Sequence, residues 1–207
     1  MIFETFPVGP FQCNCMIVGC EETGTAVVID PGEEAGRILE SLSRHQLTTA
    51  FLLHTHAHLD HVGATAEVQK KTGAAAGLHE DDMPLCENLH IQAALFGLPT
   101  PTTPKIDRFL KDGEVLSFGK SRVDVLHTPG HTPGSLSFHI PAFGLVTGDT
   151  LFAGSVGRTD LWGGSHPTLI DSIRKKLLSF PDETLVYPGH GRSTTVGRER
   201  RGNPFLT

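Results

Sequence analysis

Residues 54–63 read HTHAHLDHVG and follow the apolar run Thr49–Leu53. A short apolar run of this kind predicts a buried strand, and the loop after a strand is a place where side chains converge on one point. His56 and His58 stand two positions apart, so both side chains face the same way in an extended segment. Imidazole nitrogens, together with the carboxylate of Asp60, bind zinc and also iron or manganese. The stretch therefore predicts a metal site without selecting the metal.

Further potential ligands recur downstream, each at the end of a predicted strand. His131 lies in the Gly/Pro-rich turn HTPGHTPGS, Asp149 in TGDT and His190 in YPGHG. A single loop histidine is more often a surface residue than a ligand. Seven potential ligands that share one local context reverse that expectation, and they predict one metal centre. The set is His56, His58, Asp60, His61, His131, Asp149 and His190, while the other histidines, His54 and His127 among them, are predicted to be structural.

A sequence similarity between the two halves of the chain adds one more carboxylate to the candidate site. VVIDPG (Val27–Gly32) and LVTGDT (Leu145–Thr150) are both apolar strands that end in an aspartate and a turn. Asp30 therefore occupies the place that Asp149 occupies in the second half. A carboxylate there is suited to accept the second ring N–H of a ligating histidine and to fix its tautomer.

Composition excludes several classes of protein. The 207 residues carry 17 basic and 23 acidic side chains, a net charge of −6, and 38% of them are hydrophobic. Such a chain can bury a core, and its charge argues against binding nucleic acid or an anionic membrane surface. The first residues lack the pattern of a signal peptide, and no run approaches the length of a membrane span. We expect a cytoplasmic protein whose cysteines, Cys13, Cys15, Cys20 and Cys86, are reduced core residues; the oligomeric state cannot be read.

Strands and helices alternate along the chain, which predicts an α/β protein with two sheets covered by helices, in a single domain over residues 1–207. Helical periodicity appears in Glu33–His45, Val62–Thr72 and Pro167–Phe180, and more weakly in Asp82–Phe96, before a proline-rich crossover at Leu98–Pro104. The expected strands are Ile2–Phe6, Cys13–Val18, Thr25–Ile29, Thr49–Leu53, Ala74–Gly77, Val115–Phe118, Ser121–His127, Ser135–His139, Gly144–Val146 and Thr184–Val186.

The ordered set of motifs, H-x-H-x-D-H, then a histidine in a Gly/Pro turn, then G-D, then G-H, resembles the metallo-β-lactamase superfamily from about Phe11 to His190. The resemblance implies an αββα sandwich of two mixed β-sheets flanked by helices. It implies two divalent metal ions, with zinc expected and iron or manganese as alternatives. Asp60 and Asp149 would be the catalytic carboxylates, and Asp60 would also orient a metal-bridging hydroxide. His56, His58 and His131 would bind the first ion, Asp60, His61 and His190 the second, and Asp149 both.

Three segments narrow the resemblance. GDTLFAGSVGRTD (Gly148–Asp160), the PGHG at His190 and the pattern E-x-x-x-N-P-F (Glu199–Phe205) are similar to the glyoxalase II group, the hydroxyacylglutathione hydrolases. That similarity implies hydrolysis of a small-molecule thioester such as S-lactoylglutathione. The longer enzymes of the group have Lys-Phe-Tyr where this chain has Arg158-Thr159-Asp160. Arg158 is therefore predicted either to bind the substrate's glycine carboxylate or to pair with Asp160.

Two other activities stay open. Persulfide dioxygenases resemble this chain as well, and they would use a single Fe(II) on His56, His131 and Asp149, a ligand set that activates O₂. They carry P-A-H-D where this chain has Pro188-Gly189-His190-Gly191, so the PGHG form favours two metals and hydrolysis. The same hydrolytic chemistry would also serve another ester or lactone, because the fold does not choose the substrate.

Overall fold

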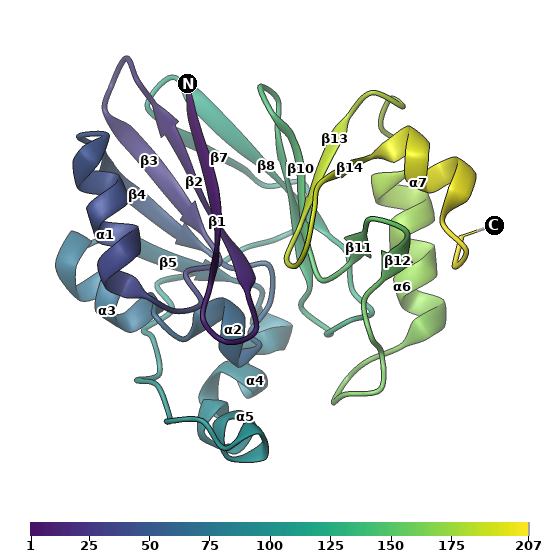
Figure 1. Cartoon of the computed structure of the whole chain (residues 1–207), viewed down its shortest axis with the longest axis horizontal. Coiled ribbons are helices and arrows are strands. Elements are labelled where there is room, and N and C mark those ends of the chain that lie inside the picture. Colours follow the sequence, from purple (N-terminus) through teal and green to yellow (C-terminus); the bar gives the residue numbers. More distant parts are fainter. Residues whose placement is uncertain (207) are drawn as a thin grey trace. The chain divides into compact units, whose positions relative to one another are not determined.

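A six-stranded mixed sheet is built from the first half of the chain (Figure 1). Strands β1 and β2 pair antiparallel, as do β2 and β3. The pairs β3 with β4, β4 with β5 and β5 with β6 are parallel. Parallel neighbours end at the same edge, which gathers the loops that follow them. In the computed structural model, which describes residues 1–206, the strands are β1 (Ile2–Val8), β2 (Cys13–Cys20), β3 (Thr25–Ile29), β4 (Thr48–Leu53), β5 (Ala75–Leu78) and β6 (Arg108–Phe109).

Two helices cover one face of this sheet, α1 (Ala35–Arg44) and α3 (Thr65–Thr72) (Figure 1). Ile38 and Leu42 recur with helical spacing on α1 and are buried against the strands. Alternate residues of β2 supply the other side of the same cluster, as the period of a strand requires. Four short helical segments complete this part of the chain: α2 (Leu59–Val62), η1 (Glu80–Asp82), α4 (Met83–Glu87) and α5 (Leu89–Phe96).

A second six-stranded mixed sheet follows. In it β10 pairs parallel with β13, whereas β9 with β10, β8 with β9 and β13 with β14 pair antiparallel. Helix α6 (His166–Ser172), its π-helical continuation η2 (Ile173–Leu177) and α7 (Val196–Gly202) pack their apolar side chains into one cluster with β10 and β13. The strands, in spatial order, are β14 (Thr194–Thr195), β13 (Leu185–Pro188), β10 (Gly144–Gly148), β9 (Leu136–Ile140), β8 (Ser121–His127) and β7 (Val115–Phe118), beside a separate hairpin of β11 (Leu151–Phe152) and β12 (Ser155–Val156).

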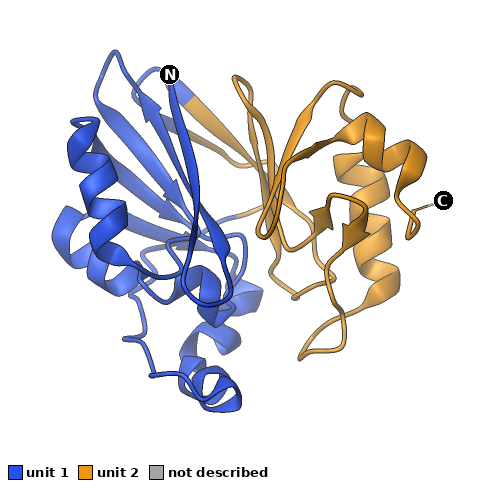
Figure 2. Cartoon of the chain, viewed as in Figure 1, with its two compact units in different colours: residues 1–110, 117–121 blue, residues 111–116, 122–207 orange. Residues whose placement is uncertain are grey.

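The chain divides into two compact units (Figure 2). Unit 1 comprises residues 1–110 and 117–121, and unit 2 comprises residues 111–116 and 122 onward. Each unit holds a hydrophobic cluster of its own. The single domain expected from the sequence stays a prediction.

The predicted elements are largely present, with three differences. The helix predicted over Val62–Thr72 is divided, because α2 ends at Val62 and α3 begins at Thr65. The helix predicted over Pro167–Phe180 changes from α- to π-helical at Ile173. No prediction covered β6, β11, β12, β14 or α7.

All four cysteines are buried and unpaired with one another, as expected of core residues. Burial raises the pKa of the Cys86 thiol to about 11. Among residues 1–206, none of the helices has the length and apolar character that crossing a membrane requires.

Candidate metal centre

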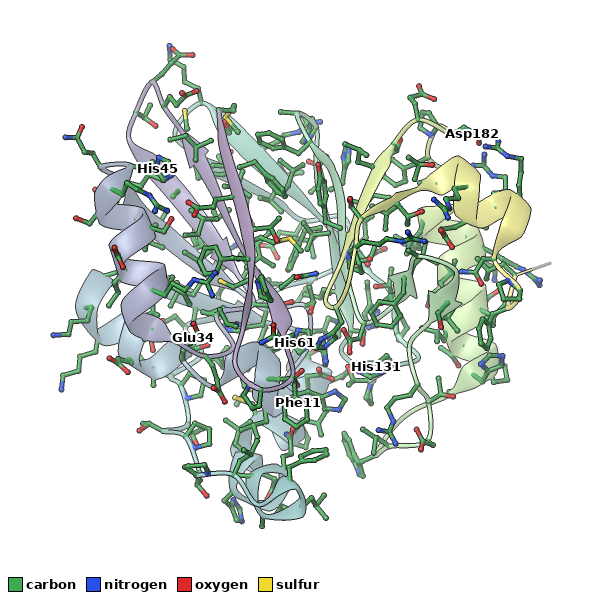
Figure 3. The ribbon with its side chains drawn as sticks, viewed as in Figure 1. Phe11, Glu34, His45, His61, His131 and Asp182 are labelled. Atoms are coloured by element: carbon green, nitrogen blue, oxygen red, sulfur yellow. The ribbon has the colours of Figure 1, made fainter. Side chains whose placement is uncertain are left out.

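Unit 1 gathers its polar residues where parallel strands end. Asp30 follows β3, Thr55 and the stretch His56–His61 follow β4, and Asp82 follows β5. Because β3, β4 and β5 are parallel, these segments meet at one edge of the first sheet. We call residues His56–His61 the ligand loop; Figure 3 marks His61.

The donor atoms of the ligand loop have the spacing of metal ligands. His56 Nε2 lies 3.0 Å from His58 Nδ1, and His61 Nε2 lies 3.6 Å from Asp60 Oδ2. Two ligand atoms held about 2 Å from an ion at a tetrahedral angle would be about 3.3 Å apart. The two atoms of each pair can therefore bind the same ion. His56 and His58 fit the first of the two positions expected from the sequence, and Asp60 and His61 fit the second.

Asp30 organises the nitrogens of the ligand loop. Its carboxylate accepts hydrogen bonds from the Thr55 N–H (2.7 Å), the Thr55 hydroxyl (2.7 Å) and His61 Nδ1 (2.9 Å). Because the Thr55 hydroxyl donates its only proton to Asp30, its oxygen must accept in the 3.1 Å contact with His56, and His56 Nδ1–H donates. In both rings Nδ1 holds the proton and Nε2 presents its lone pair, which is the tautomer that a metal ion needs. Asp30 lies directly after strand β3, as its similarity in sequence position to Asp149 predicts, and it is buried at 1% exposure.

Unit 2 gathers a second set of donors in the same way. Asp149 follows β10 and His190 follows β13, and these strands are parallel. Asp149 Oδ2 lies 3.6 Å from His190 Nε2 and 3.6 Å from His131 Nε2. The backbone carbonyl of Arg158 accepts from His131 Nδ1 at 2.7 Å, so Nε2 of this ring also presents a lone pair. One carboxylate oxygen is thus equally distant from two histidine donors.

A glycine lies directly behind the backbone of each central aspartate. A β-carbon added at Gly32 would stand 1.6 Å from the carbonyl oxygen of Asp60, and one added at Gly157 would stand 1.8 Å from that of Asp149. Only a residue without a side chain permits so close an approach. The two glycines therefore set how closely each aspartate's backbone is packed.

Arg158 forms an ion pair two residues away. Its Nε and Nη2 donate to the two oxygens of Asp160 at 2.7 and 2.8 Å. The hydrogen bonds from Arg158 hold the pKa of Asp160 at about 2. Both side chains are exposed, so the guanidinium can still be reached from solvent.

The pattern E-x-x-x-N near the end of the sequence has a structural explanation that sequence reasoning missed. Glu199 is 1% exposed and accepts from the Thr194 hydroxyl (2.6 Å), the Gly154 N–H (2.8 Å) and the Asn203 amide (2.9 Å). The Asn203 amide also donates to the Ser155 carbonyl (3.0 Å). These contacts anchor the hairpin of β11 and β12 between Asp149 and Arg158. A buried acid beside a buried amide is typical of such an anchor.

Three histidines outside the ligand set, His45, His54 and His139, make structural contacts. The His54 ring is buried; its Nδ1 donates to the Gly77 carbonyl (2.9 Å), and its Nε2 accepts from the Thr65 hydroxyl (2.7 Å). Burial lowers the pKa of His54 and keeps it neutral. His139 pairs with Asp124, and His45, at the end of α1 in Figure 3, pairs with Glu4.

Nitrogen and carboxylate donors of this kind suit divalent metal ions of the first transition row and zinc, and the paired distances fit such ions. The residues that could hold them are His56, His58, Asp60 and His61 in unit 1 and His131, Asp149 and His190 in unit 2. Two mixed sheets flanked by helices, with histidines and aspartates at their strand ends, are the arrangement of an α/β protein that can bind divalent metal ions.

A model of the metallo-β-lactamase superfamily matches residues 8–190, and the chain belongs to that superfamily. It is 43% identical over 210 residues to hydroxyacylglutathione hydrolase GloC of Haemophilus influenzae, an alignment that covers 100% of this chain and 98% of that protein. It is also 32% identical over 208 residues to the human mitochondrial persulfide dioxygenase ETHE1, covering 96% of this chain and 73% of the relative.

Two solved structures confirm the fold class. The crystal structure of the BLEG-1 B3 metallo-β-lactamase matches with a TM-score of 0.92 and 39% identity, over 100% of both chains. The crystal structure of TTHA1623 in a di-iron-bound form matches with a TM-score of 0.88 and 42% identity, over 97% of this chain and 98% of that one. The expected αββα class of two mixed sheets flanked by helices is thus correct.

Proposed function

We propose that this protein is a metal-dependent thioester hydrolase that acts on S-lactoylglutathione or a related hydroxyacylglutathione. The identity to hydroxyacylglutathione hydrolase GloC over nearly the whole of both chains supports this substrate class. The chemistry of the donor set supports a hydrolytic centre with two divalent ions.

The single observation that carries the proposal is the position of Asp149. Its Oδ2 atom is 3.6 Å from both His131 Nε2 and His190 Nε2. The mononuclear alternative, with one ion on His56, His131 and Asp149, would leave His190 unused although its Nε2 lies 3.6 Å from the same carboxylate oxygen. A carboxylate placed in this way is suited to bridge two ions, which favours hydrolysis over mononuclear oxygen chemistry.

We propose that two divalent ions would be held by both sets of donors. Asp149 would be shared by the two positions, Asp60, His61 and His190 would complete the second position, and His56, His58 and His131 would form the first. When bound, such ions activate water at neutral pH and polarise the thioester carbonyl. Asp30 keeps His61 in the tautomer that binds metal, Arg158 does the same for His131 through its carbonyl, and Asp60 orients the attacking water. Zinc is our first expectation, and iron or manganese fit the same donors.

Persulfide dioxygenase activity is the second candidate, because a persulfide dioxygenase is 32% identical to this chain. That chemistry would need one Fe(II) and O₂. It would leave His58, Asp60, His61 and His190 without a function in metal binding.

The test combines metal analysis with assays on purified protein. We expect close to two ions per chain, and a loss of thioester absorbance when S-lactoylglutathione is added. One tightly held iron, with O₂ consumed on glutathione persulfide, would overturn the hydrolase proposal in favour of the dioxygenase. Failure on the thioester by protein holding two ions, with turnover of a lactone, another ester or a β-lactam, would keep hydrolysis and change the substrate.

A further inference from the structure

Side chains of the segment from η1 to α5 form hydrogen bonds with the backbone of the ligand loop. The Ala57 N–H donates to Asp82 Oδ2 at 2.9 Å, and Asp82 is fully buried. The Leu59 N–H donates to Gln92 Oε1 at 2.9 Å, and Gln92 Nε2 donates in turn to the Ala57 carbonyl at 3.1 Å. One side-chain amide thus binds the peptide groups on both sides of His58.

His58 is the donor most directly governed by these contacts. It approaches His56 Nε2 through Nδ1, the ring nitrogen next to the point where the ring is attached. Only two side-chain rotations separate Nδ1 from the backbone, so its position follows the position of the peptide groups that flank it. The peptide groups that Gln92 binds therefore fix the backbone attachment from which those two rotations place the donor atom.

We infer that Gln92 is a positioning residue for the metal centre: its amide sets the backbone around His58 and thereby the first metal position. The inference rests on the metal site proposed above, and it adds a residue on α5 that no ligand motif includes. Groups that hold a metal ligand in place without touching the metal change metal affinity by about 10–100-fold when they are removed.

The chemistry of the site requires an amide. Gln92 accepts one hydrogen bond through Oε1 and donates two through Nε2, to Ala57 and to the Leu85 carbonyl at 3.0 Å. A carboxylate cannot donate and an ammonium cannot accept. Glutamate would set an oxygen against two carbonyl oxygens, and methionine would remove all three bonds while keeping the length of the side chain.

Gln92→Met and Gln92→Glu test the inference against a matched control, Gln69→Met. Gln69 Nε2 on α3 also bridges two groups, the Lys105 carbonyl (2.9 Å) and Asp107 Oδ2 (2.7 Å), both outside the ligand loop. Each purified variant is stripped of metal, its thermal midpoint is measured, and its affinity for Zn²⁺ is determined by competition with a chromophoric chelator.

We expect both Gln92 variants to bind Zn²⁺ at the first metal position about 10–100-fold more weakly than the parent protein. Gln69→Met should keep the Zn²⁺ affinity of the parent protein, and the thermal midpoints of the metal-free variants show how much stability each loses through its hydrogen bonds alone. Unchanged Zn²⁺ affinity in both Gln92 variants, whatever happens to the midpoint, would overturn the inference and leave Gln92 a structural link between helices. Failure of the parent protein to hydrolyse thioesters while it binds Zn²⁺ would count against the proposed substrate only, because affinity is measured without substrate.

Discussion

One carboxylate fixes the tautomer of two histidines in unit 1. Asp30 accepts the proton of His61 Nδ1 directly, and it orders the Thr55 hydroxyl so that His56 Nδ1–H must donate. The φ angle of Asp30 is 51°, in the left-handed region that aspartate tolerates better than most residues. The local backbone and the hydrogen bonds that orient His56 and His61 therefore depend on the same residue.

The two close glycines give a prediction at this scale. Gly32→Ala would force a β-carbon against the Asp60 carbonyl, so the backbone of the ligand loop must move. We expect the free energy of unfolding to fall by about 2–3 kcal/mol, as for other overpacked sites. Urea denaturation of the metal-free protein measures this change.

Gly36→Ala is the control for that prediction. Gly36 lies in α1, and a β-carbon there would meet nothing within 4 Å. Its replacement should raise the free energy of unfolding by about 0.4–1 kcal/mol, because alanine restricts the unfolded chain. Equal effects at the two glycines would show that the close approach at Gly32 is unimportant.

The ion pair of Arg158 yields a second prediction. If the guanidinium binds the substrate carboxylate, Arg158→Ala should raise KM for glutathione thioesters by about tenfold with kcat little changed, the pattern of lost uniform binding. Asp160→Asn removes the competing carboxylate and should lower KM. Steady-state kinetics of both variants decide the matter: an unchanged KM in each would mean that the pair only shapes its loop.

At the scale of elements, predictability followed element length. Strands with clear apolar runs, such as β2 and β4, were expected close to where they lie, since burial imposes their pattern. The two-residue strands β11, β12 and β14 carry no periodic signal, and contacts distant in sequence define them, such as those of Glu199. Helix α7 was missed because its sequence, VGRERRG, buries few apolar side chains.

The candidate site divides in the same manner. The donor residues could be predicted because each follows a strand and carries a distinctive side chain. Asp82 and Gln92 could not, since each acts on the loop through the backbone, and a glutamine within an apolar helix gives no sign of the peptide groups it will bind. Spacing along the chain does not encode such contacts.

Glu4 links β1 to α1, and the link predicts a pH dependence of stability. Burial acts to raise the pKa of Glu4, but hydrogen bonds from Ser41, Arg44 and His45 outweigh it, and the pKa lies below its ordinary value. A depressed pKa in the folded state stabilises the fold above the unfolded value, near 4.5, and that contribution is lost as the pH falls through the folded value.

Comparison with Glu4→Gln measures this contribution. At pH 7 the variant should unfold more readily by about 1 kcal/mol. In urea titrations repeated at successively lower pH, below 4.5, the difference should shrink toward zero as the pH falls through the depressed pKa of the folded protein and the carboxyl group becomes protonated. A difference that stays constant down to the lowest pH at which the parent protein remains folded would contradict a contribution from the charged carboxylate.

At the scale of the whole molecule, the proposed ions would couple metal content to stability. Each ion that binds only the folded chain adds about 2.7 kcal/mol when its free concentration is 100 times its dissociation constant. We expect a strong chelator to lower the thermal midpoint, and excess Zn²⁺ to restore it. Calorimetry with and without chelator measures the shift, and an identical midpoint in both would argue against ions held by the folded state.

The parallel pairing of β10 with β13 also bears on the order of events during folding. Residues 149 and 190 become neighbours only after the chain has crossed through α6 and η2, and pairings that are distant in sequence form slowly. The step that brings His190 to Asp149 therefore belongs to the late part of folding. A refolding chain should gain its high affinity for metal in the same kinetic phase in which the second sheet closes, so the rate of metal uptake would report on strand pairing rather than on diffusion of the ion.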